Sequence, residues 1–278
     1  MAGTLYLVPT PIGNLGDISV RCRKTLEQAD FIAAEDTRVS LKLLNYLELK
    51  KPLVSYYEHN KHTAGPKIVE RLLGGESCAL VTDAGSPAIS DPGEDLVRLC
   101  AEAGVPVTAI PGPCALVTAL SVSALPTGRF SFEGFLSINK KSRRAHLESL
   151  RSEPRTMIFY EAPHKLLATL EDFCAVFGPE RRISLCRELT KLHEEIRRTT
   201  LSAAAAYYAQ NAPRGEYVLV VEGAPEPEDT EMTLAEAAAL AQSAMEEGLS
   251  TKDAVRKIAQ QTGFAKNQLY DAVMKRTQ

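Results

Sequence analysis

The feature that most constrains this fold is a short apolar segment that ends in an acid and is followed by small, turn-forming residues. Residues 78–82 are apolar enough to form a strand covered on both faces, and Asp83 opens a loop of Gly, Ser, Pro and Ala that runs to Gly93. Residues 94–102 then favour a helix, so the loop lies at the carboxyl end of a strand. Ligands of open α/β sheets bind at such ends. On its own, the segment fits a ligand-binding loop or an ordinary strand-to-helix turn.

Strand and helix signals alternate along the first half of the chain, which is typical of a mostly parallel sheet. Strands are expected near residues 5–8, 31–34, 52–56, 78–82 and 105–110, and helices near 19–29, 38–47, 64–74, 93–103 and 114–123. In the second half, strands are expected near 130–136, 155–160, 182–187, 194–200 and 216–222, and helices near 141–151, 164–177 and 201–210. Because strands 182–187 and 194–200 have only a short connection, the second sheet is predicted to be mixed.

This pattern predicts an α/β protein of two lobes with a cleft between them, followed by a small helical extension. The first lobe is expected at residues 1–120 and the second at 121–224. Proline and acids in residues 223–229 end the globular pattern, which leaves 225–278 as a helical tail.

The predicted tail changes its charge along its length. Its charges are all acidic in residues 226–248 and mainly basic in residues 250–278. Ser250 with Asp253 predicts a capped helix start, and Thr262-Gly263-Phe264 separates two short amphipathic helices in the manner of a helix-turn-helix. Contact with RNA and a pair of helices with solvated basic faces are both compatible with this pattern.

Composition excludes some classes of protein. No apolar run approaches the roughly 18 residues of a membrane span, and no basic-then-apolar leader follows Met1, so a cytoplasmic location without a membrane partner is expected. The net charge of −3 means that any RNA site must be local. Six cysteines without a Cys-x-x-Cys pair indicate reduced thiols rather than zinc or disulfides. They are Cys22, Cys78, Cys100, Cys114, Cys174 and Cys186.

Several motifs at the ends of predicted strands are long enough to be specific. They are Thr10-Pro11-Ile12-Gly13-Asn14-Leu15, Ala34-Glu35-Asp36-Thr37-Arg38, Glu58-His59-Asn60, Asp83-Ala84-Gly85 with Asp91-Pro92-Gly93, and Phe159-Tyr160-Glu161. Together, over roughly residues 4–224 and the tail, the chain resembles the tetrapyrrole methylase superfamily, and within it the small-subunit ribosomal-RNA methyltransferases that methylate a cytidine 2′-hydroxyl. It departs from that pattern at Ala124 and Gly128, where Gly and Asp are expected, and at Ala162, where Ser is commoner.

The resemblance implies a two-lobed fold with S-adenosylmethionine in the cleft, held largely by backbone groups, since the chain has no Gly-x-Gly-x-x-Gly loop. Asp83 is expected to face the methionine ammonium, and the backbone near Ala115 and Leu116 to bind the adenine or ribose. Tyr160 fits either a cofactor contact or a core aromatic residue. The cofactor contacts implied by the motif match are Pro9, Asp83, Gly85, Ser86, Ala115, Leu116, Tyr160 and Leu219.

Methylating a ribose oxygen needs the methyl group in line with that oxygen and a route for its proton. The candidates for proton handling or substrate orientation are Glu35, Arg38, His59 and Lys191. A lysine can act as a base if burial lowers its pKa. Glu35 and Arg38, with Asp36 between them, fit a structural ion-pair cluster equally well. No metal is expected, because His59 and His62 lack a third clustered ligand.

The densest basic cluster is the candidate RNA-binding site, and a solvated helix start is the alternative. It consists of Lys140, Lys141, Arg143 and Arg144, which the pairs Arg181-Arg182 and Arg197-Arg198 would extend if the fold brings them together. The expected protein is a homodimeric, S-adenosylmethionine-dependent enzyme that acts on small-subunit (16S) ribosomal RNA or the assembled subunit, and not on DNA. A tetrapyrrole small-molecule methyltransferase and a non-catalytic RNA-binding module with a retained cofactor pocket are the alternatives.

Overall fold

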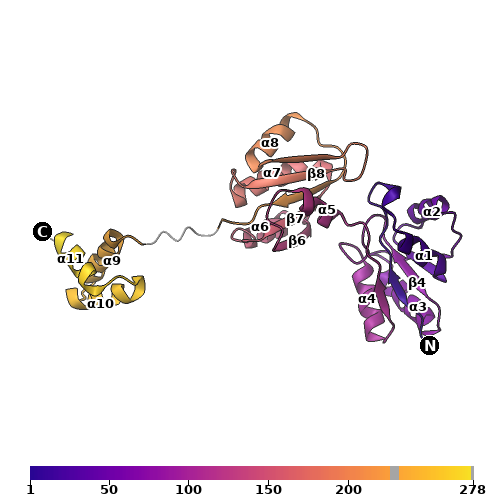
Figure 1. Ribbon diagram of the computed structural model, residues 1–278, viewed down its shortest axis with the longest axis horizontal. Coiled ribbons are helices and arrows are strands. Elements are labelled where there is room, and N and C mark those ends of the chain that lie inside the picture. The colour runs from indigo at the N-terminus through magenta and orange to yellow at the C-terminus, as the bar shows by residue number, and fades with distance from the viewer. Residues whose placement is uncertain (226–231, 277–278) are drawn as a thin grey trace. The chain divides into compact units, whose positions relative to one another are not determined.

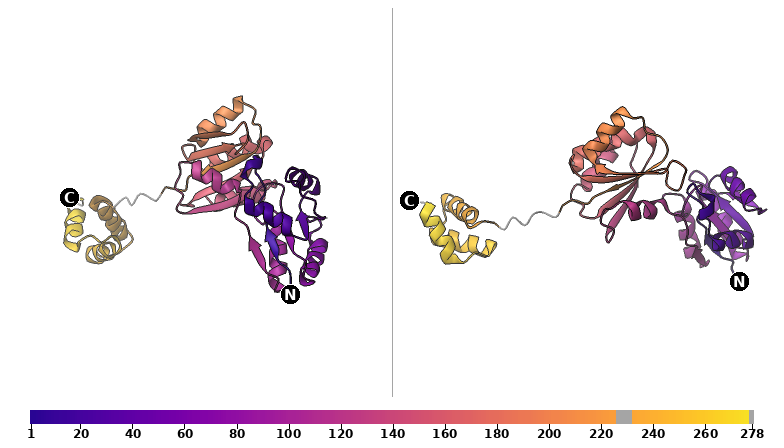
Figure 2. Two further views of the ribbon diagram at one scale, coloured as in Figure 1. Left: turned by 45° about the vertical axis from the view of Figure 1, so that its right-hand side comes forward. Right: turned by 45° about the horizontal axis from the view of Figure 1, so that its top comes forward.

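The computed structural model describes residues 1–225 and 232–276, and the chain divides into two compact units, Met1–Ala224 and Pro225–Gln278 (Figure 1). The first unit contains two five-stranded sheets with helices packed around each (Figure 2). The predicted α/β class, with two sheets and a helical extension, is confirmed.

The first sheet is parallel throughout and has the strand order β3-β2-β4-β1-β5. Its strands are β1 (Leu5–Leu7), β2 (Phe31–Ala34), β3 (Leu53–Ser55), β4 (Cys78–Val81) and β5 (Val107–Ala109). Strands β2 and β4 are buried at every residue, because helices cover both faces of the sheet. Helices α1 (Val20–Gln28) and α2 (Thr37–Tyr46) share a core with one face. Helices α3 (Lys61–Leu73) and α4 (Gly93–Glu102) share a core with the other.

The order of this sheet decides where its loops meet. Strand β4 lies between β1 and β2, so the loops that follow these three strands converge at one edge. Those loops begin near Val8, Glu35 and Thr82. The carboxyl ends of parallel strands at such a point form the usual ligand site of an open α/β sheet.

The second sheet is mixed, as predicted, with the order β6-β7-β10-β8-β9. Only the β6–β7 pair is parallel; β10 runs antiparallel to β7 and β8, and β9 antiparallel to β8. The strands are β6 (Phe130–Phe135), β7 (Thr156–Glu161), β8 (Arg182–Arg187), β9 (Glu195–Thr200) and β10 (Tyr217–Val221). Helices α6 (Lys140–Ser149), α7 (Leu166–Phe177) and α8 (Leu201–Gln210) share a core with one face.

The other face of the second sheet is covered by the first half of the chain. Helix α5 (Ala115–Val122) packs there through Leu116, Ala119 and Leu120. Ile12, from the loop after β1, belongs to the same buried cluster as Val218 of β10. The loop after β1 and helix α5 therefore share a hydrophobic core with the second sheet.

The second unit contains three helices among its described residues: α9 (Leu234–Glu246), α10 (Thr251–Thr262) and α11 (Lys266–Arg276). Small side chains of α9 pack against α10 and α11. Ser250 caps α10 as predicted, since its side chain accepts from the Asp253 N–H. Gly263 ends α10 in the left-handed conformation, at φ 77°. The first part of the stretch whose charges are all acidic, residues 226–231 of 226–248, lies outside the described residues. Across residues 1–225 and 232–276, no helix is long and apolar enough to cross a membrane.

Candidate active site

A cleft of about 520 Å³ is lined by residues of both sheets' loops. This volume lies within the roughly 300–1,000 Å³ of small-molecule sites. The first half of the chain contributes Glu35 and the loop after β4, including Asp83 to Ser86. The second half contributes Tyr160, Lys191 and other side chains. The predicted cleft between the lobes is thus present; we call it the donor cleft.

Hydrogen bonds between loops fix the floor of the donor cleft. The Thr82 hydroxyl donates to Glu35 Oε2 at 2.8 Å, and the Asp36 N–H donates to Asp83 Oδ1 at 3.1 Å. The Thr10 hydroxyl donates to the Thr82 carbonyl at 3.0 Å. Three loops that follow adjacent strands are therefore held together at the sheet edge. Gly85 has φ 91°, which explains why glycine stands there.

The next part of this loop holds strained backbone. Ala88 and Ser90 have φ values of 68° and 65°, which non-glycine residues rarely adopt. Asp91 supports them, because its Oδ1 accepts from the N–H groups of Ala88 at 2.8 Å and Gly93 at 2.9 Å. Each such conformation costs on the order of 1–3 kcal/mol and is concentrated at functional sites.

Carboxylates in the cleft have perturbed acidity. Partial burial, and then the neighbouring Glu35 carboxylate, raise the pKa of Asp83. Burial also raises the pKa of Asp91, against the hydrogen bonds from Gly93 and Ala88. A cluster of perturbed acids in a cleft is a physical indication of a functional site.

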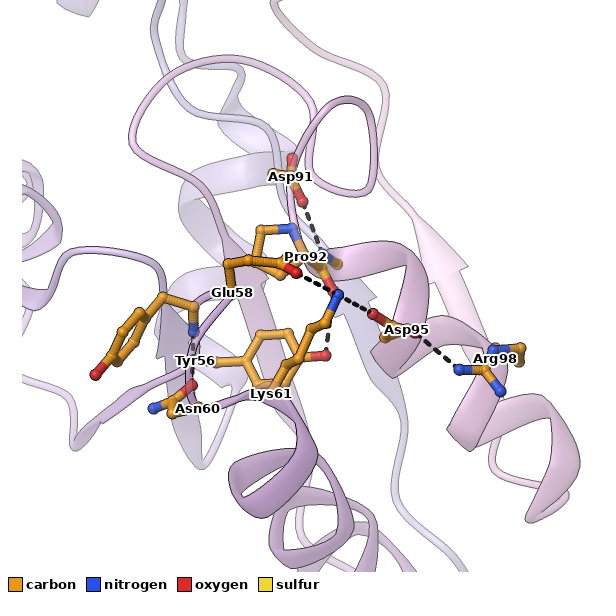
Figure 3. Close-up of polar contacts among 10 residues, drawn as sticks. Tyr56, Glu58, Asn60, Lys61, Asp91, Pro92, Asp95 and Arg98 are labelled. Atoms are coloured by element: carbon orange, nitrogen blue, oxygen red, sulfur yellow. Dashed lines mark hydrogen bonds and ion pairs between the residues drawn. The ribbon is translucent and has the colours of Figure 1, made fainter. Parts of the chain in front are cut away.

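A polar network behind the loop fixes where α4 begins (Figure 3). Lys61 Nζ lies 2.7 Å from both Glu58 and Asp95, and the Tyr56 hydroxyl donates to the Pro92 carbonyl at 3.1 Å. Burial raises the pKa of Tyr56 to about 12. Through these contacts the loop after β3 anchors the turn that follows Asp91.

Of the predicted cofactor contacts, five line the donor cleft: Asp83, Gly85, Ser86, Ala115 and Tyr160. Burial raises the pKa of Tyr160 to about 12, and its ring packs edge-on against Phe132 and Phe135. Pro9, Leu116 and Leu219 are not among the lining residues. Leu219 is fully buried in the core of the second sheet, because alternate residues of β10 face opposite sides, and Val218 lines the cleft instead.

Of the four predicted catalytic residues, Glu35 and Lys191 line the donor cleft, and Arg38 and His59 do not. Arg38 pairs with Asp36 at 2.6 Å, and its side chain is 87% exposed. Burial alone would lower the pKa of Lys191, but hydrogen bonds to Glu216 and Glu188 raise it. The condition under which Lys191 could act as a base, a pKa lowered by burial, is therefore not met.

Two family models match this chain. The model of the Tetrapyrrole (Corrin/Porphyrin) Methylases matches residues 4–205, and the model of the RsmI C-terminal HTH domain matches residues 231–277. The ribosomal RNA small subunit methyltransferase I of Synechocystis sp. is 48% identical over 272 residues, which cover 96% of each chain. The chain belongs to the tetrapyrrole methylase family, in its ribosomal RNA small subunit methyltransferase I branch.

Other members of this branch are similar over the same length. The proteins of that name from Pseudomonas aeruginosa and Bacillus subtilis are 46% and 43% identical, over 99% and 97% of this chain and 98% and 94% of their own.

Solved structures of tetrapyrrole methylases and related enzymes share the fold at lower identity. The uroporphyrin-III C-methyltransferase of Thermus thermophilus complexed with S-adenyl homocysteine has a TM-score of 0.57 at 16% identity, over 79% of this chain and 97% of that one. Diphthine synthase has a TM-score of 0.63 at 14% identity, over 79% and 90%.

In this tetrapyrrole methylase, the predicted RNA-binding residues separate into two groups. Lys140, Lys141 and Arg144 are exposed on α6. The Arg143 side chain is only 12% exposed, because it donates to Asp172 Oδ2 at 2.6 Å and to the Thr169 hydroxyl at 2.9 Å. Arg143 is therefore turned into the protein and does not contribute to the exposed basic surface.

The arginine pairs expected to extend this cluster are also held by the protein. Arg197 pairs with Glu195 at 2.6 Å and stacks on Tyr207, and Arg198 donates to the Val122 carbonyl. Arg181 and Arg182 donate to the carbonyls of Glu222 and Ala124, respectively.

The sequence motifs also included a buried acid of the cleft whose role we did not predict. Glu161 lines the donor cleft, is only 4% exposed, and accepts hydrogen bonds from the Thr169 hydroxyl and the Ala162 N–H. An acid at the end of the apolar strand β7 was the available signal. All six cysteines are free, and within residues 1–225 and 232–276 no group of His, Cys, Asp or Glu side chains is arranged to hold a metal ion.

Proposed function

We propose that this chain transfers a methyl group from S-adenosylmethionine to the 2′-oxygen of a cytidine ribose in small-subunit ribosomal RNA. The observation that supports this proposal most directly is the extent of the similarity to proteins named ribosomal RNA small subunit methyltransferase I. That similarity covers both the unit with the cleft and the helical tail. The solved tetrapyrrole methylases instead cover about four fifths of the chain, for example 78% for a uroporphyrin-III C-methyltransferase.

The donor cleft fits S-adenosylmethionine by its chemistry. The carboxylate of Asp83 suits the ammonium of the amino-acid end, and Gly85 lets a ligand approach the backbone closely. Apolar walls that include Tyr160 and Val218 suit the flat adenine. When bound, S-adenosylmethionine supplies a methyl group on a positively charged sulfur and leaves as the neutral thioether.

Glu35 is the proposed acceptor of the 2′-hydroxyl proton. Its carboxylate lines the cleft and is oriented by the Thr82 hydroxyl. Lys191 keeps its proton, because Glu188 and Glu216 raise its pKa, so we assign it to orienting oxygen atoms in the cleft. Arg38 and His59 lie outside the cleft and are proposed to contact RNA at the surface.

The exposed part of the basic cluster is the proposed RNA surface. Lys140, Lys141 and Arg144 follow Phe135, which lines the donor cleft and is 59% exposed. Lysine and arginine neutralise phosphates, and an exposed aromatic ring can stack on a base. RNA bound at α6 would therefore extend toward the cleft.

A homodimer and a cytoplasmic location complete the proposal. Large apolar side chains are exposed on the first unit, including Val20, Ile138 and Leu192. Such surface is a candidate for burial between two copies. Light scattering at several protein concentrations measures the oligomeric state directly, and a monomer at every concentration would contradict the dimer.

The first experiment incubates the protein with methyl-labelled S-adenosylmethionine and undermethylated small ribosomal subunits, followed by digestion to nucleosides. Label on the 2′-oxygen of cytidine supports the proposal. If subunits and free RNA stay unlabelled while the cofactor binds, the RNA assignment falls, and tetrapyrrole acceptors are tested next.

Variants then test the proposed roles. Glu35→Gln should lower kcat by roughly 10²–10⁴ and leave S-adenosylhomocysteine binding intact. Joint substitution of Lys140, Lys141 and Arg144 by Glu should raise the KM for subunits and reduce its salt dependence. Lys67→Glu, at an exposed lysine of α3, is the matched control and should have little effect.

A further inference from the structure

A second hollow, of about 250 Å³, lies beside the donor cleft and shares Thr82 and Asp83 with it. It is formed by the loop after β1 and by one side of helix α2. We call it the α2 groove. The residues used below are Leu15, Val39, Lys42 and Tyr46, together with the two shared residues.

Large apolar side chains line the groove and are exposed to solvent. Tyr46 is 55% exposed, Leu15 42% and Val39 37%. Val39 and Tyr46 are seven residues apart on α2, and Lys42 lies between them, so all three lie on one side of the helix. An exposed aromatic ring beside a lysine is the usual combination for a base and its phosphate.

The wall between the two hollows carries the groups that the reaction needs. Asp83 belongs to both linings, and Thr82 orients Glu35 from the same wall. A nucleotide whose base lies in the α2 groove would place its ribose at this wall. The 2′-hydroxyl would then face the methyl donor on one side and a carboxylate on the other.

The size of the groove favours one kind of occupant. Its volume is about half that of the donor cleft, 250 against 520 Å³. A hollow of this volume can hold a single nucleobase turned out of its RNA strand, but it is too small for a tetrapyrrole macrocycle. We infer that the α2 groove holds the base of the target nucleotide, stacked on Tyr46, with Lys42 at the adjoining phosphate. This inference rests on the proposed function.

The test compares Tyr46→Ala, Tyr46→Phe and Lys42→Ala in methyl transfer to undermethylated small subunits. Loss of stacking should lower kcat/KM roughly 5- to 150-fold in Tyr46→Ala, whereas Tyr46→Phe retains the ring and should stay near the wild type. Lys42→Ala should raise the KM and flatten its salt dependence. The affinity for S-adenosylhomocysteine, measured by calorimetry, should be unchanged in all three.

Two exposed residues near the groove serve as matched controls. Leu41 lies on the same helix and is 50% exposed, and Lys50 is an exposed residue that follows the end of this helix. Neither side chain lines the groove. Leu41→Ala and Lys50→Ala should leave kcat/KM unchanged. If Tyr46→Ala and Lys42→Ala behave like these controls, or if they weaken S-adenosylhomocysteine binding as much as methyl transfer, the inference is overturned.

A binding measurement separates this inference from the proposed function. The affinity of each variant for small subunits is measured with S-adenosylhomocysteine present. If the wild type binds subunits without methylating them, the proposed function falls, and the loss or retention of binding in Tyr46→Ala still decides the role of the groove. If the wild type neither binds nor methylates subunits, both fall.

Discussion

Gly13 offers a quantitative test of how the two halves of the donor cleft fit together. Its φ is 143°, and a Cβ atom there would lie 2.4 Å from Lys191 Cγ and 3.0 Å from Thr190 Oγ1. The backbone conformation costs a non-glycine residue about 1–3 kcal/mol, and the steric overlap costs about 1–3 kcal/mol more. Because Lys191 can move partly aside, we expect Gly13→Ala to lower the free energy of unfolding by about 2–4 kcal/mol.

Two further glycines separate these contributions. Gly104 has φ 69° with nothing within 4 Å of a Cβ, so Gly104→Ala should cost only the conformational strain, about 1–2 kcal/mol. Gly128 has open space and no positive φ, so Gly128→Ala should be neutral or stabilising by up to about 1 kcal/mol. Urea unfolding followed by circular dichroism gives all three values. Equal stability of Gly13→Ala and Gly104→Ala would refute the steric argument.

Three other predictions concern stability. Arg143→Ala should cost about 1–2 kcal/mol in urea unfolding, because Asp172 and Thr169 lose their donor, whereas Lys141→Ala should change stability by less than about 0.5 kcal/mol. Phe173→Ala should cost about 3–5 kcal/mol, since its fully buried ring packs between Phe159 and Phe177; a calorimetric Tm within error of the wild type would contradict this. Hydrogen bonds from Lys61 and then Arg98 lower the pKa of Asp95 from 3.8 to about 2, so their stabilisation is present above pH 3.8 and is lost as the pH falls toward 2. The stability difference between the wild type and Lys61→Met should shrink over that range, and a constant difference would exclude the ion pair as its cause.

The secondary structure was largely predictable because its signals are local. Strand β2 begins and ends with its apolar run, and the buried residues of β8 lie between Arg182 and Arg187. Helix α1 begins after the capping residue Ser19. The strand orders were not predicted, because they depend on which distant segments pair. The order places β4 between β1 and β2, and that placement creates the cleft floor at Glu35 and Asp83.

Three predicted site residues have surroundings that the sequence did not indicate, because each side chain is oriented by a part of the fold that lies elsewhere in the chain. Arg143 is as basic as Lys141, but Asp172 of α7 holds it against the protein. Lys191 is partly buried, but Glu216, which lies far along the chain, keeps it protonated. Leu219 lies on the face of β10 that packs against α6, α7 and α8. Which face of a strand points toward these helices depends on how the whole sheet is packed. Sequence spacing located these segments without giving their partners.

The core shared by α5, Ile12 and the second sheet limits how the donor cleft can move. Ile12 and Leu116 come from the first half of the chain, yet they are buried with Val218 and Ile158 of the second sheet. Swinging the sheets apart would expose these side chains to water, at about 25 cal/mol for each Å² of apolar surface. The first 224 residues should therefore melt in a single transition, and a ligand would enter a cavity that already has its final shape rather than one that closes around it.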